Sequence, residues 1–115
     1  MNTTEELLFK NEITGADLEQ LLSERESGSV EFLLIDVREE YEYNEQKIIG
    51  TDYLIPLSDF FNQTDKIEKY KNHHIVATCK LGGRSAQAQM QLKKAGFKSV
   101  INLKGGISHY QGPTN

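Results

Sequence analysis

The sequence has little cysteine and no long apolar run, and each shortage excludes a class of protein. A single cysteine cannot form an internal disulfide, so the sequence favours a reducing, cytoplasmic setting. No apolar run approaches the ~20 residues that a membrane-spanning helix needs. Residues 1–6 have neither the basic start nor the apolar core of a secretory signal. We therefore expect no membrane among the partners of this chain.

An excess of positive charge is also missing. The chain carries 13 basic and 17 acidic side chains, for a formal net charge of −4. A general nucleic-acid surface needs clustered lysine and arginine, so we expect no nucleic-acid partner. The hydrophobic content is 37%, and no repeat, low-complexity tract or linker divides the chain, which indicates one globular domain over residues 1–115.

Strand-like and helix-like segments alternate along the chain. Residues 32–35 form a continuous apolar run, typical of a strand buried on both faces of a parallel sheet, and residues 74–78 form another. Thr14, with Asp17 three positions later, predicts a helix N-terminus ahead of a leucine stripe. The alternation predicts an α/β fold: a mostly parallel sheet of about five strands with helices on both faces.

The other elements follow from shorter signals. A short strand or arm is predicted at 7–9, and strands at 53–57 and 100–103. Helices are predicted at 39–45, from Ser58 as N-cap to about residue 70, at 85–95 with Gly96 after its end, and briefly after the turn at 105–106.

The one cysteine, Cys79, stands at the end of the apolar 74–78 run and just before a predicted helix. Backbone N–H groups and the helix dipole converge at such a point, where they lower the pKa of a thiol and hold an anion beside it. Asp36 also follows an apolar strand directly, and ligands of parallel sheets bind beyond the carboxyl ends of strands. We therefore expect a reactive cysteine at this edge. The residues that follow it are Lys80, Leu81, Gly82, Gly83, Arg84 and Ser85.

The competing interpretation is a small buried hydrophobe, which is the commonest role of a lone intracellular cysteine. A structural cysteine would sit inside the strand, whereas Cys79 lies where apolar character stops. The two glycines and two cations in the next residues suit anion handling rather than a core. An exposed thiol at such a site is also open to oxidation.

Three segments of the chain, taken in order, carry a family resemblance. They are Asp36-Val37-Arg38-Glu39 with Glu42-Tyr43 and Ile48-Ile49-Gly50, then Cys79-Lys80-Leu81-Gly82-Gly83-Arg84-Ser85, then Leu103-Lys104-Gly105-Gly106-Ile107. Together they resemble the single-domain form of the rhodanese family. The resemblance covers about residues 10–112, which makes this range the expected core of a rhodanese-like domain.

The resemblance implies a sulfurtransferase without cofactor or metal. The Cys79 thiolate would take a sulfur atom from thiosulfate or a persulfide and pass it to a thiol or cyanide, or within a relay to another sulfur-carrying protein. Backbone N–H groups of residues 80–85 would cradle the persulfide, Lys80 and Arg84 would attract a dianionic donor, and Ser85 would donate to the sulfur.

The polar residues near the loop have structural alternatives. Asp36 and Arg38 are expected to order the loop, Asp36 by accepting N–H groups and Arg38 by pairing with Glu42 or Glu39. Arg84 has the alternative of a solvated residue at a helix start. His74 precedes Cys79 by five strand residues, roughly 16 Å, so a cysteine–histidine dyad is excluded. His109 is expected in solvent, and no histidine spacing suggests zinc.

Three other functions compete with sulfur transfer. Cysteine phosphatases and arsenate reductases have five residues between cysteine and arginine, whereas four separate Cys79 from Arg84, a ring that suits one sulfur atom. A nucleotide-binding loop would require glycine at Thr78 and lysine at Arg84. A non-catalytic sulfur carrier, sensor or protein-binding module of the same family stays open, although such modules often lack the cysteine.

Overall fold

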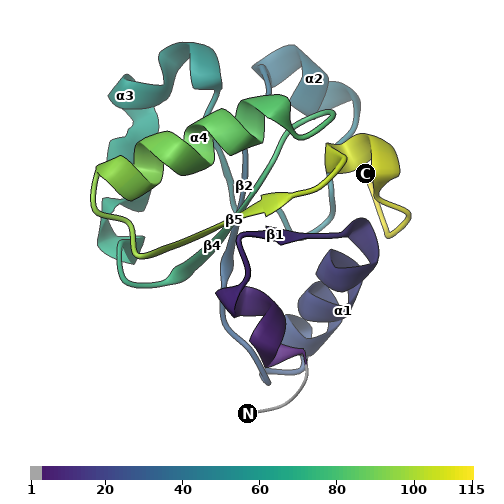
Figure 1. The fold of residues 1–115 in the computed structure, drawn as a ribbon. Helices are drawn as coiled ribbons and strands as arrows, with labels where there is room; N and C mark the ends of the chain where they lie inside the picture. Colours follow the sequence, from purple (N-terminus) through teal and green to yellow (C-terminus); the bar gives the residue numbers. More distant parts are fainter. Residues whose placement is uncertain (1–3) are drawn as a thin grey trace.

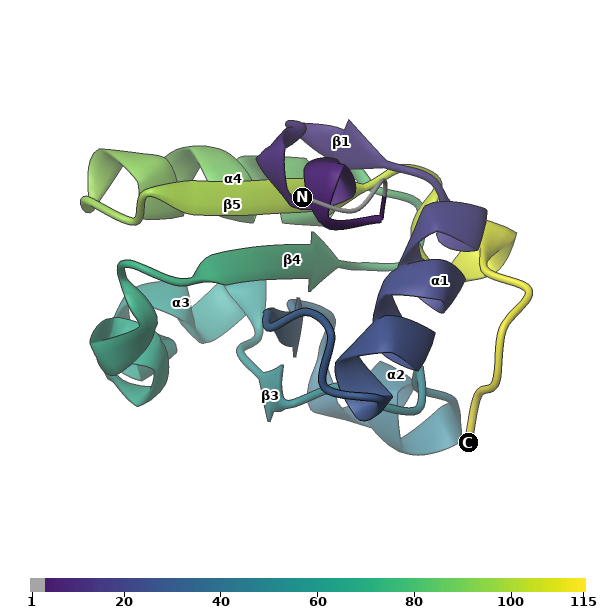
Figure 2. The ribbon, with the colours of Figure 1, turned by 90° about the horizontal axis from the view of Figure 1, so that it is seen from below.

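A parallel sheet of five strands organises residues 4–115, the part of the chain that the computed structural model describes (Figure 1). The strands lie in the order β1-β5-β4-β2-β3, and every neighbouring pair is parallel. Figure 2 shows β1, β5 and β4 one after another in this order. The predicted α/β class and five-stranded parallel sheet are confirmed. The strands are β1 (Glu12–Ile13), β2 (Leu33–Asp36), β3 (Tyr53–Leu54), β4 (His74–Thr78) and β5 (Ser99–Leu103).

Helices cover both faces of this sheet, as the sequence predicts. Alternate residues of the central strands face opposite ways, so Leu34 and Val76 join one apolar cluster and Ile35 and Ile75 join the other. The helix α1 (Gly15–Glu26) packs on the first cluster, and α3 (Phe60–Gln63) with α4 (Gly83–Lys94) packs on the second. In Figure 1, α3 and α4 lie above the strands and α1 lies below. The apolar runs are therefore buried on both faces.

The helix ends confirm several local predictions. Thr14 and Asp17 form the capping box of α1. Gly96, directly after the C-cap of α4, has a φ of 98°, the left-handed conformation that glycine adopts without strain. The helix α2 (Glu40–Glu45) begins after Glu39 and carries a capping box of its own. No helix within residues 4–115 is long and apolar enough to cross a membrane.

Some predicted elements are wrong. Residues 7–9 belong to a 3-10 helix, η1 (Glu5–Phe9), and the strand at this edge is β1. The predicted strand 53–57 ends at Leu54, because Pro56 has no N–H and the chain turns into η2 (Leu57–Asp59).

The helix predicted over about 58–70 is divided into η2, α3 and η3 (Thr64–Tyr70). Ser58 does not cap it, because the Ser58 hydroxyl donates to the two carboxylate oxygens of Glu39 at 2.9 and 2.7 Å. The short segment after the turn at 105–106 is a 3-10 helix, η4 (Gly106–His109), as expected in place and length.

Candidate functional site

Two neighbouring strand ends create the candidate site. Asp36, the last residue of β2, lies in register with Thr78, the last residue of β4, and the Val37 N–H donates to the Thr78 carbonyl at 2.9 Å. Cys79 follows Thr78 directly, and α4 begins four residues later. The fold thus sets the thiol between the carboxyl edge of the sheet and a helix N-terminus, where partial positive charge accumulates.

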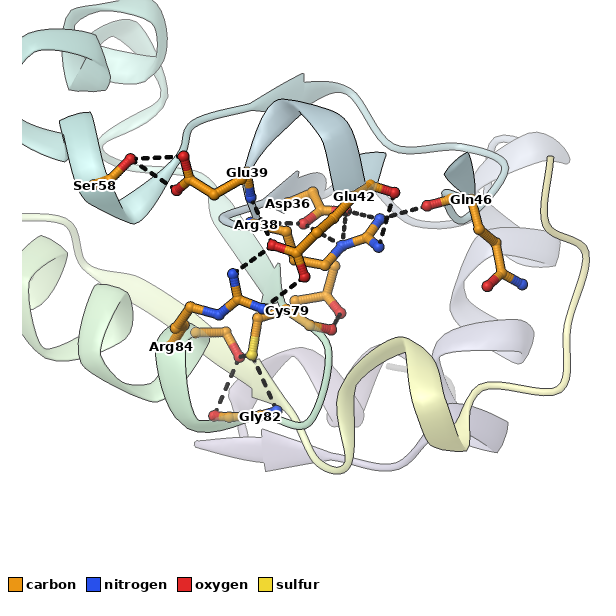
Figure 3. A network of polar contacts seen from close by, with 11 residues as sticks. Asp36, Arg38, Glu39, Glu42, Gln46, Ser58, Cys79, Gly82 and Arg84 are labelled. Carbon is orange, nitrogen blue, oxygen red and sulfur yellow. Dashed lines mark hydrogen bonds and ion pairs between the residues drawn. The ribbon is translucent and has the colours of Figure 1, made fainter. Parts of the chain in front are cut away.

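The Cys79 sulfur lies inside a ring of hydrogen-bond donors (Figure 3). The Gly82 N–H donates to Sγ at 3.0 Å, and the Ser85 hydroxyl lies 3.3 Å from Sγ. Gly82 reaches this position with a φ of 106°, which favours glycine. Cys79 is only 1% exposed, so the expectation of an exposed thiol is wrong. The loop folds back over the sulfur and buries it.

The ring favours the ionised sulfur. Burial raises the pKa of the Cys79 thiol, but hydrogen bonds from the Ser85 hydroxyl and from the backbone N–H groups of Ser85, Gly82 and Leu81 lower it further than burial raises it. The net pKa is below its ordinary value. A thiolate is the nucleophilic form of cysteine, so this site prepares the thiol for attack on an electrophile.

Asn102, which the sequence analysis did not identify as a site residue, supports the ring of donors through two hydrogen bonds. Its Nδ2 donates to the Gly82 carbonyl at 3.2 Å, and its Oδ1 accepts from the Ser85 hydroxyl at 2.6 Å. Asn102 is 5% exposed on β5. The signal in the sequence is an amide inside an otherwise apolar strand, since a buried amide needs hydrogen-bond partners.

The start of η4 contacts the cysteine loop through two backbone hydrogen bonds. The Ile107 N–H donates to the Cys79 carbonyl at 2.9 Å, and the Ser108 N–H donates to the Lys80 carbonyl at 3.1 Å. Gly106 approaches so closely that a Cβ there would clash with the Cys79 carbonyl oxygen and lie 2.6 Å from that of Lys80. The closing segment therefore fixes the backbone that carries the thiol.

Asp36 and Arg38 form a buried ion pair with each other. The Arg38 Nη2 lies 2.7 Å from the Asp36 carboxylate, and the Arg38 backbone N–H also donates to Asp36. The Arg38 Nε–H donates to the same carboxylate, and Nη1 and Nη2 also donate to the carbonyls of Glu42 and Gln46. The predicted pairing of Arg38 with the carboxylate of Glu42 or Glu39 is wrong. The turn after β2 brings the Asp36 and Arg38 side chains together. Through the contacts of Arg38 the pair orders residues 36–46, and not the cysteine loop itself.

Arg84 pairs with the carboxylate that was expected to bind Arg38. Its Nη1 and Nη2 donate to the two Glu42 oxygens at 2.7 and 2.9 Å, so the contact is bidentate (Figure 3). Hydrogen bonds from Arg84 hold the pKa of Glu42 at about 2 despite the opposing effect of burial. Arg84 is therefore neither a simply solvated residue nor a free cation. Lys80, by contrast, is exposed and has no ion-pair partner within residues 4–115.

Within residues 4–115, no histidine hydrogen-bonds to the Cys79 sulfur. His74, at the opposite end of β4, has its Nδ1 2.7 Å from the Ser99 hydroxyl, and His109 is exposed. The described residues contain no group of three or more histidine, cysteine, aspartate or glutamate side chains able to hold a metal ion.

Known proteins share this fold and sequence pattern. Residues 17–112 match the family described as "Rhodanese-like domain". A tRNA uridine(34) hydroxylase of Buchnera aphidicola is 34% identical over 104 residues, which cover 85% of this chain and 31% of that protein. The putative sulfur carrier protein YrkF of Bacillus subtilis is 36% identical over 81 residues, which cover 70% of this chain and 42% of that protein. The chain thus spans less than half the length of each of these two relatives.

A solved structure agrees with the match in sequence. The rhodanese-like domain of the Anabaena protein Alr3790 superposes with a TM-score of 0.76 at 28% identity, covering 92% of this chain and 79% of that one.

Proposed function

The chain belongs to the rhodanese-like domain family, and on that premise we propose that it is a sulfurtransferase whose Cys79 carries the transferred sulfur atom. The observation that carries this proposal is the ring of donors around a buried thiol with a lowered pKa. Such a ring of donors would stabilise negative charge on Sγ or on a sulfur atom attached to it. No cofactor or metal takes part in the proposed reaction.

The reaction proceeds in two displacements. The Cys79 thiolate attacks the outer sulfur of a donor such as thiosulfate or a persulfide, and the sulfur–sulfur bond of the donor breaks. Sulfite or a thiolate leaves with the electron pair, and Cys79 becomes a persulfide. A thiol or cyanide acceptor then attacks the terminal sulfur and regenerates the Cys79 thiolate. Each step exchanges one bond to sulfur for another, so no external oxidant or reductant is needed.

The chain's own residues have distinct roles in this scheme. The N–H groups of Leu81, Gly82 and Ser85 and the Ser85 hydroxyl stabilise negative charge on the sulfur. Lys80 attracts the anionic donor from solvent. A reducing, cytoplasmic setting is part of the proposal, because Cys79 must remain a free thiol between cycles.

A non-catalytic sulfur carrier is the second candidate. One of the relatives in sequence is described as a putative sulfur carrier protein, and a carrier needs the same persulfide ring. The two functions differ in the second displacement, because a carrier would hand its sulfur to a protein partner and react slowly with small acceptors.

Intact-mass analysis tests the proposal. Reduced protein is incubated with thiosulfate, polysulfide or glutathione persulfide, beside a Cys79→Ser control. We expect a gain of one sulfur atom that is absent from the control and is lost when cyanide or a thiol is added. A persulfide that forms but resists both acceptors would favour the carrier. If none of the donors adds sulfur to Cys79, the sulfurtransferase proposal is wrong.

A further inference from the structure

The charge around the loop differs from what a dianionic donor needs. Arg84 is the cation closest in sequence to the helix start, but both of its terminal nitrogens are bound to the Glu42 carboxylate. The pair joins α2 to α4 across 42 residues of sequence and leaves no net charge. The Glu42 side chain is 15% exposed, so water does little to replace Arg84 as its partner.

The pair stands in the electrostatic field of the sulfur. A negative charge on Cys79 raises the pKa of the Arg84 guanidinium, as the Glu42 contact does more strongly. Arg84 therefore stabilises negative charge at the sulfur, but the Glu42 carboxylate beside it offsets this stabilisation. A dianion that needs the full charge of Arg84 must compete with a bidentate carboxylate already in place.

A cleft beside the loop offers one unpaired charge of each sign. It has a volume of about 340 Å³, and its walls include Lys80 from the loop, Arg38, and Tyr41, Glu42 and Glu45 from α2. Arg38 and Glu42 are already paired with Asp36 and Arg84, so the charges left for a ligand within the described part of the chain are those of Lys80 and Glu45. Tyr41 is 68% exposed, and Glu45 has no ion-pair partner within residues 4–115. A carboxylate and an aromatic face suit an ammonium group, whereas they repel or ignore an anion.

We propose that the Glu42–Arg84 pair makes this site select persulfide donors that carry a cationic group, and makes it disfavour dianionic thiosulfate. The inference rests on the proposed sulfur transfer and specifies its donor class. In this scheme Lys80 attracts the sulfur end of the donor, and the Glu45 and Tyr41 side of the cleft receives its ammonium. Glu42 is a specificity-determining residue, because it neutralises Arg84 without contacting the sulfur.

A donor series of graded charge tests this assignment. Rates of Cys79 persulfide formation are measured by quenched-flow mass spectrometry with thiosulfate, with the persulfide of mercaptopropionate and with the persulfide of cysteamine. For each donor the rate of the Glu42→Gln variant is divided by the wild-type rate, so intrinsic donor reactivity cancels. We expect thiosulfate to gain about tenfold, the mercaptopropionate persulfide to gain similarly, and the cysteamine persulfide to stay within about twofold or fall.

Glu40→Gln is the matched control, because Glu40 is an exposed residue of the same helix outside the cleft, and its loss removes the same charge without releasing Arg84. Its thiosulfate rate should change by about twofold or less. The thiosulfate gain of Glu42→Gln should also shrink at high ionic strength. Glutamine at this position preserves the capping box of α2, so the variant is expected to fold, and far-UV circular dichroism checks this.

Arg84→Gln gives a second test with the opposite sign. It leaves Glu42 negative and unpaired, so thiosulfate should react about tenfold more slowly while the cysteamine persulfide gains. Equal effects of Glu42→Gln and Glu40→Gln, or no change in donor preference, would overturn the inference but leave sulfur transfer intact. Failure of wild-type Cys79 to accept sulfur from any of the three donors would instead count against the proposed function, on which the inference rests.

Discussion

At the scale of single residues, the Ser85 hydroxyl is one of the donors that lower the pKa of Cys79 against the opposing effect of burial. This hydroxyl has one proton and three acceptors near it: Cys79 Sγ at 3.3 Å, the Gly82 carbonyl at 3.3 Å and Asn102 Oδ1 at 2.6 Å. A neutral thiol is a weak acceptor, so the Ser85 hydroxyl then donates its hydrogen bond to Asn102 Oδ1. An ionised sulfur is a charged acceptor and draws the proton toward itself.

The Ser85→Ala variant should therefore raise the pKa of Cys79. A hydrogen bond to a charged group is worth about 1.5–3 kcal/mol, and one pKa unit corresponds to about 1.4 kcal/mol, so we expect a rise of about one unit. The measurement is the ultraviolet absorbance of the thiolate as a function of pH. Ser58→Ala, which removes a hydroxyl bound to Glu39, should leave the midpoint unchanged. An unchanged midpoint in Ser85→Ala would mean that the backbone N–H groups alone stabilise the thiolate.

The sequence predicts the contacts of some site residues and not those of others. The loop from Cys79 to Ser85 is contiguous, so its motif predicts the neighbours of the sulfur directly. Asn102 comes from a different strand, and nothing local marks which loop its amide faces. The predicted partner of Arg38 was wrong for a related reason: Arg38 lies in the turn between β2 and α2, and its guanidinium pairs with Asp36 of β2 and with backbone carbonyls rather than with a carboxylate of α2.

At the scale of elements, the contact between η4 and the cysteine loop depends on one glycine. Gly106 has a φ of 57° and lies against the carbonyls of Cys79 and Lys80. We expect Gly106→Ala to lower the free energy of unfolding by about 2 kcal/mol or more and to abolish persulfide formation, because the loop must move. Urea unfolding and intact-mass analysis measure the two effects.

Gly83 provides the matched control for Gly106. A Cβ at Gly83 would meet no heavy atom within 4 Å, and Gly83 has no positive φ. Gly83→Ala should keep the persulfide and gain up to about 1 kcal/mol of stability, because alanine favours the first turn of α4. Equal losses in both variants would show that the loop tolerates no added methyl group anywhere, rather than a specific contact at Gly106.

Elements with strong periodicity were predicted well, and short edge elements were not. The buried strands β2 and β4 are continuous apolar runs, and their pairing follows from the α/β alternation. The two-residue strands β1 and β3 carry no such pattern. The segment after Pro56 divides into short helices because Ser58, expected to cap one helix, binds Glu39 instead. A tertiary contact thus overrides the local capping signal.

At the scale of the whole molecule, topology was predictable and long-range ion pairing was not. Right-handed crossovers bring the carboxyl ends of β2 and β4 together whatever the loops contain. Which carboxylate of α2 meets Arg84 depends on the exact approach of α2 to α4, across 42 residues of sequence. That contact also neutralises Arg84, so the surface around the cysteine loop carries less positive charge than the sequence led us to expect from Lys80 and Arg84.

The same contact links α2 to α4 and should make the stability of the whole domain depend on acid pH. The pKa of Glu42 is about 2 in the folded protein, against an ordinary value of 4.5. A depressed carboxyl pKa contributes stability that is fully present above about pH 4.5 and is lost as pH falls toward 2. The full shift corresponds to about 3 kcal/mol, but the Arg84 side chain is 36% exposed, and solvent screening reduces the expected contribution to about 1 kcal/mol.

Urea unfolding of wild type and Glu42→Gln between pH 7 and pH 2.5 measures this contribution. At pH 7 the variant should be about 1 kcal/mol less stable, and the difference should shrink steadily below about pH 4.5, because the wild type protonates Glu42 on unfolding and the variant does not. Glu45→Gln, whose carboxylate has no ion-pair partner within residues 4–115, should differ little from wild type at any pH. A Glu42→Gln difference that stays constant with pH would assign its cost to packing instead of charge, and would remove the electrostatic basis for the link between α2 and α4.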